Sequence, residues 1–258
     1  TTLAFGVRNS GSRAERMRID SGGRLLIGTT STRGTHGGGD ARLQIEGTGT
    51  DSAGMSITRT SDDAGSPTFS FGKTRNGSAL SDGDDVGVIY WQGDDGTDLA
   101  TAMCSIKGEV DGSVSGNAVP GRITFNTATS STNLTERLRI ESSGRIGINQ
   151  SSPQRILHIG ESGTAEANLR IQGGADYFEL RVKDGDNAFG IHRNIAGGGS
   201  NESFRILSGG NVNIGGNFTQ TTYTMQVTGT FNATGNITQN GNALATAGKA
   251  VAMALVFG

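Results

Sequence analysis

The stretch Glu15-Arg-Met-Arg-Ile-Asp-Ser-Gly-Gly-Arg-Leu-Leu-Ile27 decides the fold, because the chain uses it more than once. A second copy, Glu136-Arg-Leu-Arg-Ile-Glu-Ser-Ser-Gly-Arg-Ile-Gly-Ile148, is identical to the first at eight of thirteen positions. A third and looser copy is Ser203-Phe-Arg-Ile-Leu-Ser-Gly-Gly-Asn-Val-Asn-Ile214. Repeated sequence implies repeated structure, so these three segments set the architecture.

Each copy has the pattern of a short β-hairpin. Apolar residues alternate on the way into the turn, as at Met17 and Ile19, and again on the way out, as at Leu25 and Ile27. This period of two is the signature of a strand whose two faces differ. Ser-Gly-Gly or Ser-Ser-Gly lies between the arms, where glycine can adopt the positive φ of a tight turn. The pattern predicts three antiparallel hairpins, each with an apolar and a charged face.

A single hairpin of this kind is too thin to stand alone. Its apolar face holds about four aliphatic side chains, and an isolated two-stranded hairpin is marginally stable at best. The missing apolar surface has to come from neighbouring repeats or from other copies of the chain. Three copies around an axis would form a narrow core without free sheet edges. We predict that this trimer core contains Met17, Ile19, Leu25, Ile27, Leu138, Ile140, Ile146, Ile148, Phe204, Ile206, Val212 and Ile214.

The composition also favours a slender all-β rod. Glycine is in excess, with 43 among 258 residues, and only 33% of residues are hydrophobic. Those apolar residues are regularly spaced, which argues against disorder. Net charge is −2, from 22 basic and 24 acidic residues that are interspersed, so no basic stripe is present for a nucleic acid.

Cysteine content and hydropathy exclude further classes. Cys104 is the only cysteine, so there is no intrachain disulfide framework, as in a reducing compartment or in a cysteine-poor extracellular protein. No apolar run approaches the ~20 residues of a membrane-spanning helix. The N-terminus lacks a secretory signal pattern and opens in a strand-like run at residues 3–7, which suggests a preceding segment.

Matched strands flank the hairpins. Strand-like runs precede the three hairpins at residues 5–9, 123–126 and 189–194. After the first two hairpins the matched runs continue in pairs, which predicts further strands at 43–45 and 157–159, at 55–57 and 169–171, and at 69–71 and 178–182.

The spacing of the repeats predicts an inserted β-module. It contains two strand-like runs, Val86-Gly-Val-Ile-Tyr-Trp91 and Ala100-Thr-Ala-Met-Cys-Ser-Ile106, separated by a polar turn. We expect a first shaft repeat at 1–77 with its hairpin at 15–28, the inserted module at 78–119, second and third shaft repeats at 120–215 with hairpins at 136–149 and 203–215, and a C-terminal stacked β-coil with an apolar tail at 216–258.

Residues 15–30 closely resemble a motif common in tailed-phage fibres and related virion appendages, and residues 136–153 are similar to it. Residues 241–258 are similar to the C-termini of structural proteins from marine phages. The resemblance implies an elongated homotrimeric fibre, β-helix-like or β-prism-like, with intertwined β-structure. It also implies synthesis in the host cytoplasm, a place on the virion as a tail or capsid appendage, contact with other virion proteins and a role in host attachment. Many relatives end in an autocleaving chaperone domain, and none is visible here.

Catalytic and metal-binding patterns are not apparent. The histidines are His36, His158 and His192, without a His-x-His motif or a cysteine pair, which argues against zinc. The Asp-rich turns at 82–85, 94–98 and 184–186 lack the order of an EF-hand loop and are expected to be solvated turns rather than calcium sites. No Gly-x-Ser-x-Gly elbow occurs, and no pair of carboxylates stands out for glycoside hydrolysis. We expect no catalytic residues, no metal and no cofactor, and therefore a protein that is not an enzyme.

Recognition of sugars has one candidate region. Aromatic faces stack on sugar rings and polar groups bond hydroxyls, and the residues Tyr90, Trp91, Gln92, Asp94 and Asp95 combine both. The alternative is that Trp91 belongs to the core of its small sheet. The hairpin arginines Arg16, Arg18, Arg137 and Arg139 are expected to form cross-strand or inter-subunit pairs with Glu15, Asp20, Glu136 and Glu141.

The expected function is host attachment by a trimeric fibre that binds cell-surface polysaccharide through several weak sites. Neither nucleic-acid binding nor membrane insertion is expected. Two alternatives stay open: a passive capsid-decorating or connecting fibre without receptor binding, and a tailspike polysaccharide depolymerase.

Overall fold

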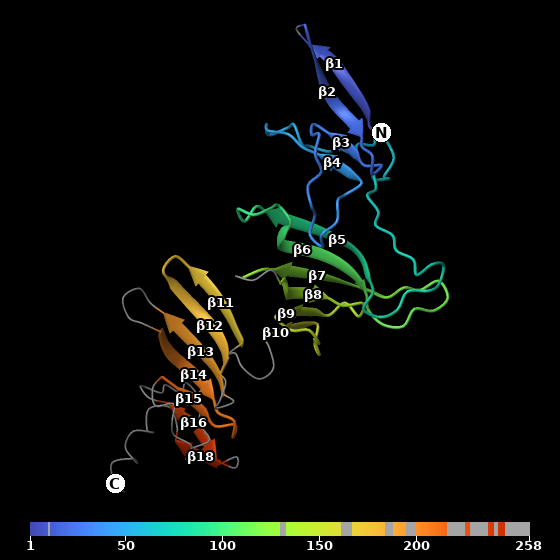
Figure 1. Cartoon of the computed structure of the whole chain (residues 1–258). Coiled ribbons are helices and arrows are strands. Elements are labelled where there is room, and N and C mark those ends of the chain that lie inside the picture. Colours follow the sequence, from blue (N-terminus) through green and yellow to red (C-terminus); the bar gives the residue numbers. More distant parts are fainter. Residues whose placement is uncertain are drawn as a thin grey trace. The chain divides into compact units, whose positions relative to one another are not determined.

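The computed structural model describes residues 1–9, 11–129, 133–160, 167–183, 188–194, 200–215, 225–227, 237–239 and 242–245. Every regular element in these ranges is a β-strand, and none is a helix (Figure 1). The chain divides into two compact units, Thr1–Ile159 and Gly160–Gly258, which are described separately. The predicted fold class is therefore confirmed at the level of an all-β protein whose strands are mostly antiparallel.

The first unit contains two open sheets. The first sheet has the order β1-β2-β3-β4, with bounds Leu3–Asn9, Ser12–Ile19, Leu25–Ile27 and Leu43–Ile45. The second sheet has the order β10-β9-β8-β7-β6-β5. Its strands are β5 (Asp85–Gly93), β6 (Thr101–Val110), β7 (Gly121–Thr127), β8 (Thr135–Ile140), β9 (Ile146–Ile148) and β10 (Leu157–Ile159).

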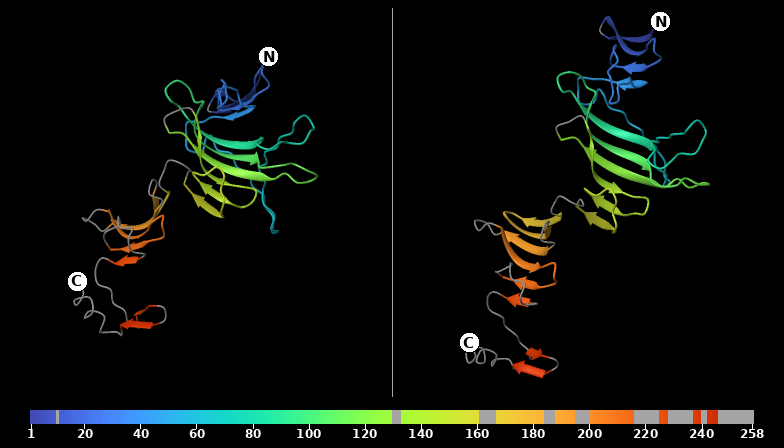
Figure 2. Two further views of the ribbon diagram at one scale, coloured as in Figure 1. Left: turned by 90° about the horizontal axis from the view of Figure 1, so that it is seen from below. Right: turned by 60° about the horizontal axis from the view of Figure 1, so that its bottom comes forward.

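The second unit repeats the plan. Its main sheet runs in chain order through β11 (Ala167–Gly173), β12 (Asp176–Lys183), β13 (Ala188–Asn194), β14 (Ser200–Ile206), β15 (Val212–Ile214) and β16 (Met225–Val227). A two-stranded ribbon follows, β17 (Ile237–Gln239) and β18 (Asn242–Ala245). Figure 2 shows the sheets from two further directions, and none of them closes on itself within the described residues.

The three predicted hairpins are present as β2–β3, β8–β9 and β14–β15. Their turns are alike: the N–H groups of Gly23, Gly144 and Gly210 donate to carbonyls three residues earlier at 3.0, 2.8 and 2.8 Å. These glycines have φ of 73°, 80° and 83°, the left-handed region that glycine adopts without a steric penalty. The turn chemistry predicted from Ser-Gly-Gly and Ser-Ser-Gly is therefore confirmed.

A β-bulge occurs at the same place in all three repeats. The pairing register skips Arg16 in β2, Arg137 in β8 and Ser203 in β14. The carbonyl of each skipped residue instead accepts the N–H of the residue that follows the second strand of its hairpin, which is β3, β9 or β15. The three distances are 3.1, 2.8 and 3.0 Å. Those donors are Gly28, Asn149 and Gly215, all with positive φ. The bulge and the left-handed residue that bonds to it therefore occur together in every repeat.

The strands predicted after the hairpins are only partly present. Residues 43–45 and 157–159 form β4 and β10, each parallel to the strand before it in the sheet. Residues 169–171 and 178–182 lie in the antiparallel pair β11–β12. The prediction of strands at 55–57 and 69–71 is wrong for the single chain, where these residues are irregular. In the third sheet, β12 pairs with β13. The corresponding position in the second sheet, beside β7, is occupied by β6.

The segment predicted as an inserted module, residues 78–119, contributes β5 and β6 to the second sheet. Nine-residue β5 pairs with β6, and β6 pairs with β7 from Cys104 to Val110. The module therefore continues the sheet of the second hairpin. The predicted C-terminal tail beyond residue 245 lies outside the described residues.

The third hairpin offers a matched test of the turn. Gly209 and Gly210 are neighbours, an added Cβ at either would meet open space, and only Gly210 has a positive φ. We expect Gly210→Ala to lower the free energy of unfolding by about 1 kcal/mol, since an L-residue is strained in the left-handed region. Gly209→Ala should be neutral or slightly stabilising. Urea unfolding of both variants measures this, and equal effects would contradict the described turn.

Candidate functional site: sheets with two unlike faces

Each of the three larger sheets exposes its apolar face. In the second sheet the register aligns Ile106 with Phe125, Phe125 with Leu138, and Leu138 with Ile148 on one side. Large apolar side chains on the corresponding faces of the three sheets are between 36% and 66% exposed. They include Leu3, Phe5, Ile19, Leu43, Ile89, Trp91, Ile123, Phe125, Ile140, Ile148, Leu157, Leu169, Ile171, Phe178, Leu180, Val182, Phe189, Ile206 and Met225.

The predicted core residues lie on these faces. Ile19, Ile140, Ile148 and Ile206 are exposed, while the other eight are intermediate in burial. Within the described residues, the fully buried apolar side chains are few: Leu26, Ala102, Val110 and Ala188. The single chain therefore leaves most of its patterned apolar surface in contact with water.

The opposite, polar face of each sheet is closed by a repeated ion pair. Arg18 binds both carboxylate oxygens of Glu15. Arg139 binds Glu136 at 2.7 and 2.8 Å, and Arg205 binds Glu202 at 2.7 and 2.5 Å. Planar guanidinium and carboxylate groups match in this bidentate geometry. The hydrogen bond from Arg18 lowers the pKa of Glu15, and the bond to Glu136 raises the pKa of Arg139.

The bulge makes this ion pair possible. In a regular strand, residues three apart point to opposite faces. Skipping Arg16, Arg137 or Ser203 adds one residue on that strand, so Glu and Arg of a Glu-x-x-Arg sequence face the same side. Backbone geometry and side-chain chemistry therefore act together in every repeat.

Chain connections also cover the polar face in the first unit. The guanidinium of Arg18 donates to the carbonyl of Thr30 at 3.0 Å, and the amide of Gln44 donates to the carbonyl of Arg33 at 3.2 Å. In the second sheet, a Cβ on Gly147 would lie 2.1 Å from the carbonyl oxygen of Gln150, so only glycine fits beneath that connection.

Several polar side chains are consequently buried on this face. Thr124, Ser105 and Asn126 are buried on the second sheet, where Asn126 donates to the other two at 3.1 and 3.2 Å. Glu179 and His192 are their counterparts on the third sheet, with Arg181 3.2 Å from Glu179 and Glu202 3.6 Å from His192. The covered side of each sheet is the hydrogen-bonded one.

The expected pairing of the hairpin arginines needs correction. Arg18 and Arg139 pair within their own strands, with only a longer contact of 3.7 Å from Arg139 to Glu141. Asp20 instead binds Arg24 at 2.8 Å across the turn. Arg137 donates to the hydroxyl of Thr127 at 3.0 Å. Sequence reasoning also missed Glu202, because the third copy was read from Ser203; the Glu-x-x-Arg spacing of the first two copies identifies it.

The candidate sugar-binding residues are not brought together. Trp91 pairs with Cys104 on the apolar face, whereas Tyr90 pairs with Ser105 on the polar face. The Tyr90 ring lies 4.7 Å from the ring of His36. Both aromatic residues are exposed, Trp91 at 47%.

The polar members of the candidate set serve the loop between β5 and β6. Gln92 donates to the carbonyl of Leu99 at 3.0 Å. Asp94 accepts the N–H of Gly96 at 2.8 Å, and Asp95 accepts the hydroxyl of Thr101 at 2.7 Å. The bond from Thr101, followed by N–H groups of Thr97 and Asp98, lowers the pKa of Asp95. These carboxylates stabilise the loop.

A further polar cluster fixes the backbone directly before β5. The Asp84 carboxylate is buried and accepts from Lys73 at 3.0 Å, from Arg75 at 2.6 and 2.8 Å, and from the N–H of Ser81 at 2.8 Å. The Arg75 guanidinium, then the Ser81 N–H and the Lys73 ammonium, hold the pKa of Asp84 well below its usual range.

Within the described ranges, no group of three or more His, Cys, Asp or Glu side chains is arranged to hold a metal ion. No helix there is long and apolar enough to span a membrane. Comparisons of the chain with protein-family models and with curated proteins find no match.

The Asp84 cluster predicts a pH dependence. Because the pKa of Asp84 is lower when folded than when unfolded, its contribution is complete at neutral pH and declines as the pH falls below about 4. Asp84→Asn should therefore be less stable than the wild type at pH 7, and the difference should shrink toward pH 2. Thermal unfolding across this range measures it, with the exposed Asp62→Asn as control. A constant difference would contradict the ion cluster.

Proposed function

We propose that the chain is a subunit of a homotrimeric fibre on the virion of a tailed phage, and that this fibre attaches to glycans of the host cell surface. The observation that carries the proposal is the uncovered apolar face of each sheet. The resemblance of residues 15–30 and 136–153 to phage-fibre motifs gives the proposal its biological setting.

Self-association is supported by the contrast between the two faces. Contiguous exposed apolar patches of this extent are unusual on monomeric soluble proteins and mark interaction surfaces. The apolar face occurs in three repeats with the same alternation, so one type of contact can recur in each repeat. Three copies around an axis would bring Ile123 and Ile140 of each chain against their equivalents. The result would be a β-prism-like shaft with charged outer faces.

Attachment is proposed for the side of the β5–β6 hairpin that does not enter this core. If the apolar faces meet in the trimer, Trp91 belongs to the assembly surface, whereas Tyr90 stays on the outer side. Tyr90 lies beside His36, and an exposed aromatic ring next to polar groups suits a sugar ring. Three such sites on one fibre would add through avidity.

The assembly is tested first. We expect the purified chain to sediment with the mass of three copies of 26.6 kDa. The double variant Ile123→Ser with Ile140→Ser should shift it toward the monomer, because each residue loses roughly 1.5–3 kcal/mol of burial. Val119→Ser, at an exposed apolar residue outside the strands, should leave the mass unchanged. A monodisperse 26.6 kDa species that melts cooperatively would refute the proposal.

Attachment is tested with the assembled protein. We expect fluorescently labelled protein to adsorb to susceptible bacteria, and Tyr90→Ala to reduce adsorption at least tenfold without changing the sedimentation mass. Tyr177→Ala, an aromatic change in the second unit, is the control. Absence of adsorption across a bacterial panel would favour a passive fibre, and release of reducing sugar from host polysaccharide would establish a depolymerase.

A further inference from the structure

Residues 54–72 have strand-like sequence but pair with no strand in the described part of the chain. Their apolar residues alternate as Met55 and Ile57, then Phe69 and Phe71, in the same order as Leu169–Ile171 and Phe178–Leu180. The latter residues form the antiparallel pair β11–β12. In the part of the chain that the structure describes, no backbone hydrogen bond joins residues 54–72 to another strand. Every residue from 47 to 79 is exposed, and the four apolar side chains are 48% to 61% exposed.

The chain's own sheet has no equivalent place for this segment. In the third sheet β12 lies between β11 and β13, whereas in the second sheet β6 occupies the side of β7 that faces away from β8. The insertion of β5 and β6 therefore displaces residues 54–72 from the position that their counterparts hold. The sheet ends instead at β5, a nine-residue strand whose one partner among the described residues is β6.

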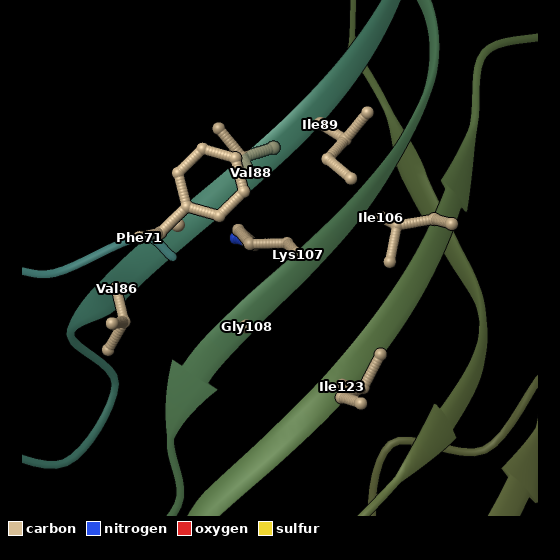
Figure 3. A pocket seen from close by; sticks show the side chains of 9 residues that line it. Phe71, Val86, Val88, Ile89, Ile106, Lys107, Gly108 and Ile123 are labelled. Carbon is tan, nitrogen blue, oxygen red and sulfur yellow. The ribbon is translucent and has the colours of Figure 1, made fainter. Parts of the chain in front are cut away.

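One residue fastens the displaced segment to its own sheet. Gly87 and Gly108 are paired across β5 and β6, and their missing side chains leave a shallow apolar depression of about 270 Å³. Phe71 packs over Gly87 and forms one wall of this depression: a Cβ on Gly87 would be only 2.5 Å from the Cβ of Phe71. Figure 3 shows the Phe71 ring over β5, with Ile106 and Ile123 on the neighbouring strands. The Phe69 ring packs edge-on against Phe71 at 4.9 Å.

We propose that residues 54–58 of one copy add as a β-strand to the open edge of β5 in a second copy. The strand ends before the turn that Asp63 forms with Arg59 and Gly65. The alternating side chains of residues 54–58 would extend the apolar face of β5 beside Ile89 and Trp91. A free edge strand with exposed apolar residues is a ready template for such pairing. The twelve residues between Thr58 and Phe71 span at most about 40 Å, far enough for a neighbouring chain. The inference rests on the proposed self-assembly and names the contact that ties the copies together.

The available area favours a second copy as the occupant. Met55, Ile57 and Phe69, together with the exposed apolar side chains of the second sheet, offer on the order of 800 Å² per chain, which is the size of one side of a stable interface. Pairing along β5 would also satisfy the backbone groups of both partners, which apolar contact alone does not.

Photo-crosslinking of the full chain tests the inference. Ile57 is replaced by the photoreactive benzoylphenylalanine, and the assembled protein is irradiated and run on a denaturing gel. We expect a covalent two-chain product whose crosslinked peptides lie in β5 or β6. The same photoreactive residue at Val119, which is 56% exposed, should give at most a tenth of that product.

A second measurement keeps the two proposals separate. Met55→Ser combined with Ile57→Ser should raise the concentration at which the assembly dissociates at least tenfold, while Val119→Ser leaves it unchanged. Products only within one chain, or between chains but outside β5 and β6, overturn the pairing, although the trimer would stand if the sedimentation mass is that of three copies. A monomeric wild type overturns both proposals.

Discussion

The structure depends on the paired Glu-x-x-Arg groups that close one face of each sheet. The pairs Glu15–Arg18, Glu136–Arg139 and Glu202–Arg205 occur at the same place in every repeat, on strands whose bulge turns both groups to one side. Because guanidinium and carboxylate satisfy each other, the polar face can be covered without orphaned charges. Apart from Phe71 over β5, the apolar face is left largely uncovered by the described residues. In a single copy the hydrogen-bonded face of these sheets is covered, and the aliphatic face is exposed to water.

Much of the secondary structure could be predicted from sequence, since period-two alternation and glycine turns are local signals. The hairpins, the left-handed glycines and the strands at 43–45 and 157–159 followed from such signals. Strands at 55–57 and 69–71 did not, because a strand also needs a partner, and β6 takes the position that a matching hairpin would have filled. Pattern alone does not reveal that competition between segments.

The candidate site was harder to predict for a related reason. Adjacent residues in a strand point to opposite faces, so Tyr90 and Trp91, neighbours in sequence, cannot form one binding surface while they lie in β5. The acidic residues beside them bond to their own loop. Thr124 and Asn126 are buried, whereas Ile123 and Phe125 are exposed, because the chain connections cross the face on which Thr124 and Asn126 lie. Alternation identifies two faces but not which one is covered.

The way in which β5 and β6 join the second sheet has a consequence for how such a chain can change in length. Two strands were accommodated at a sheet edge while the bulge, the ion pair and the turn of the neighbouring hairpin kept the geometry found in the other repeats. A hairpin added at an edge alters neither the register nor the charges of the strands already paired. Chains of this plan can therefore acquire lateral decorations one hairpin at a time, while the repeating frame stays the same.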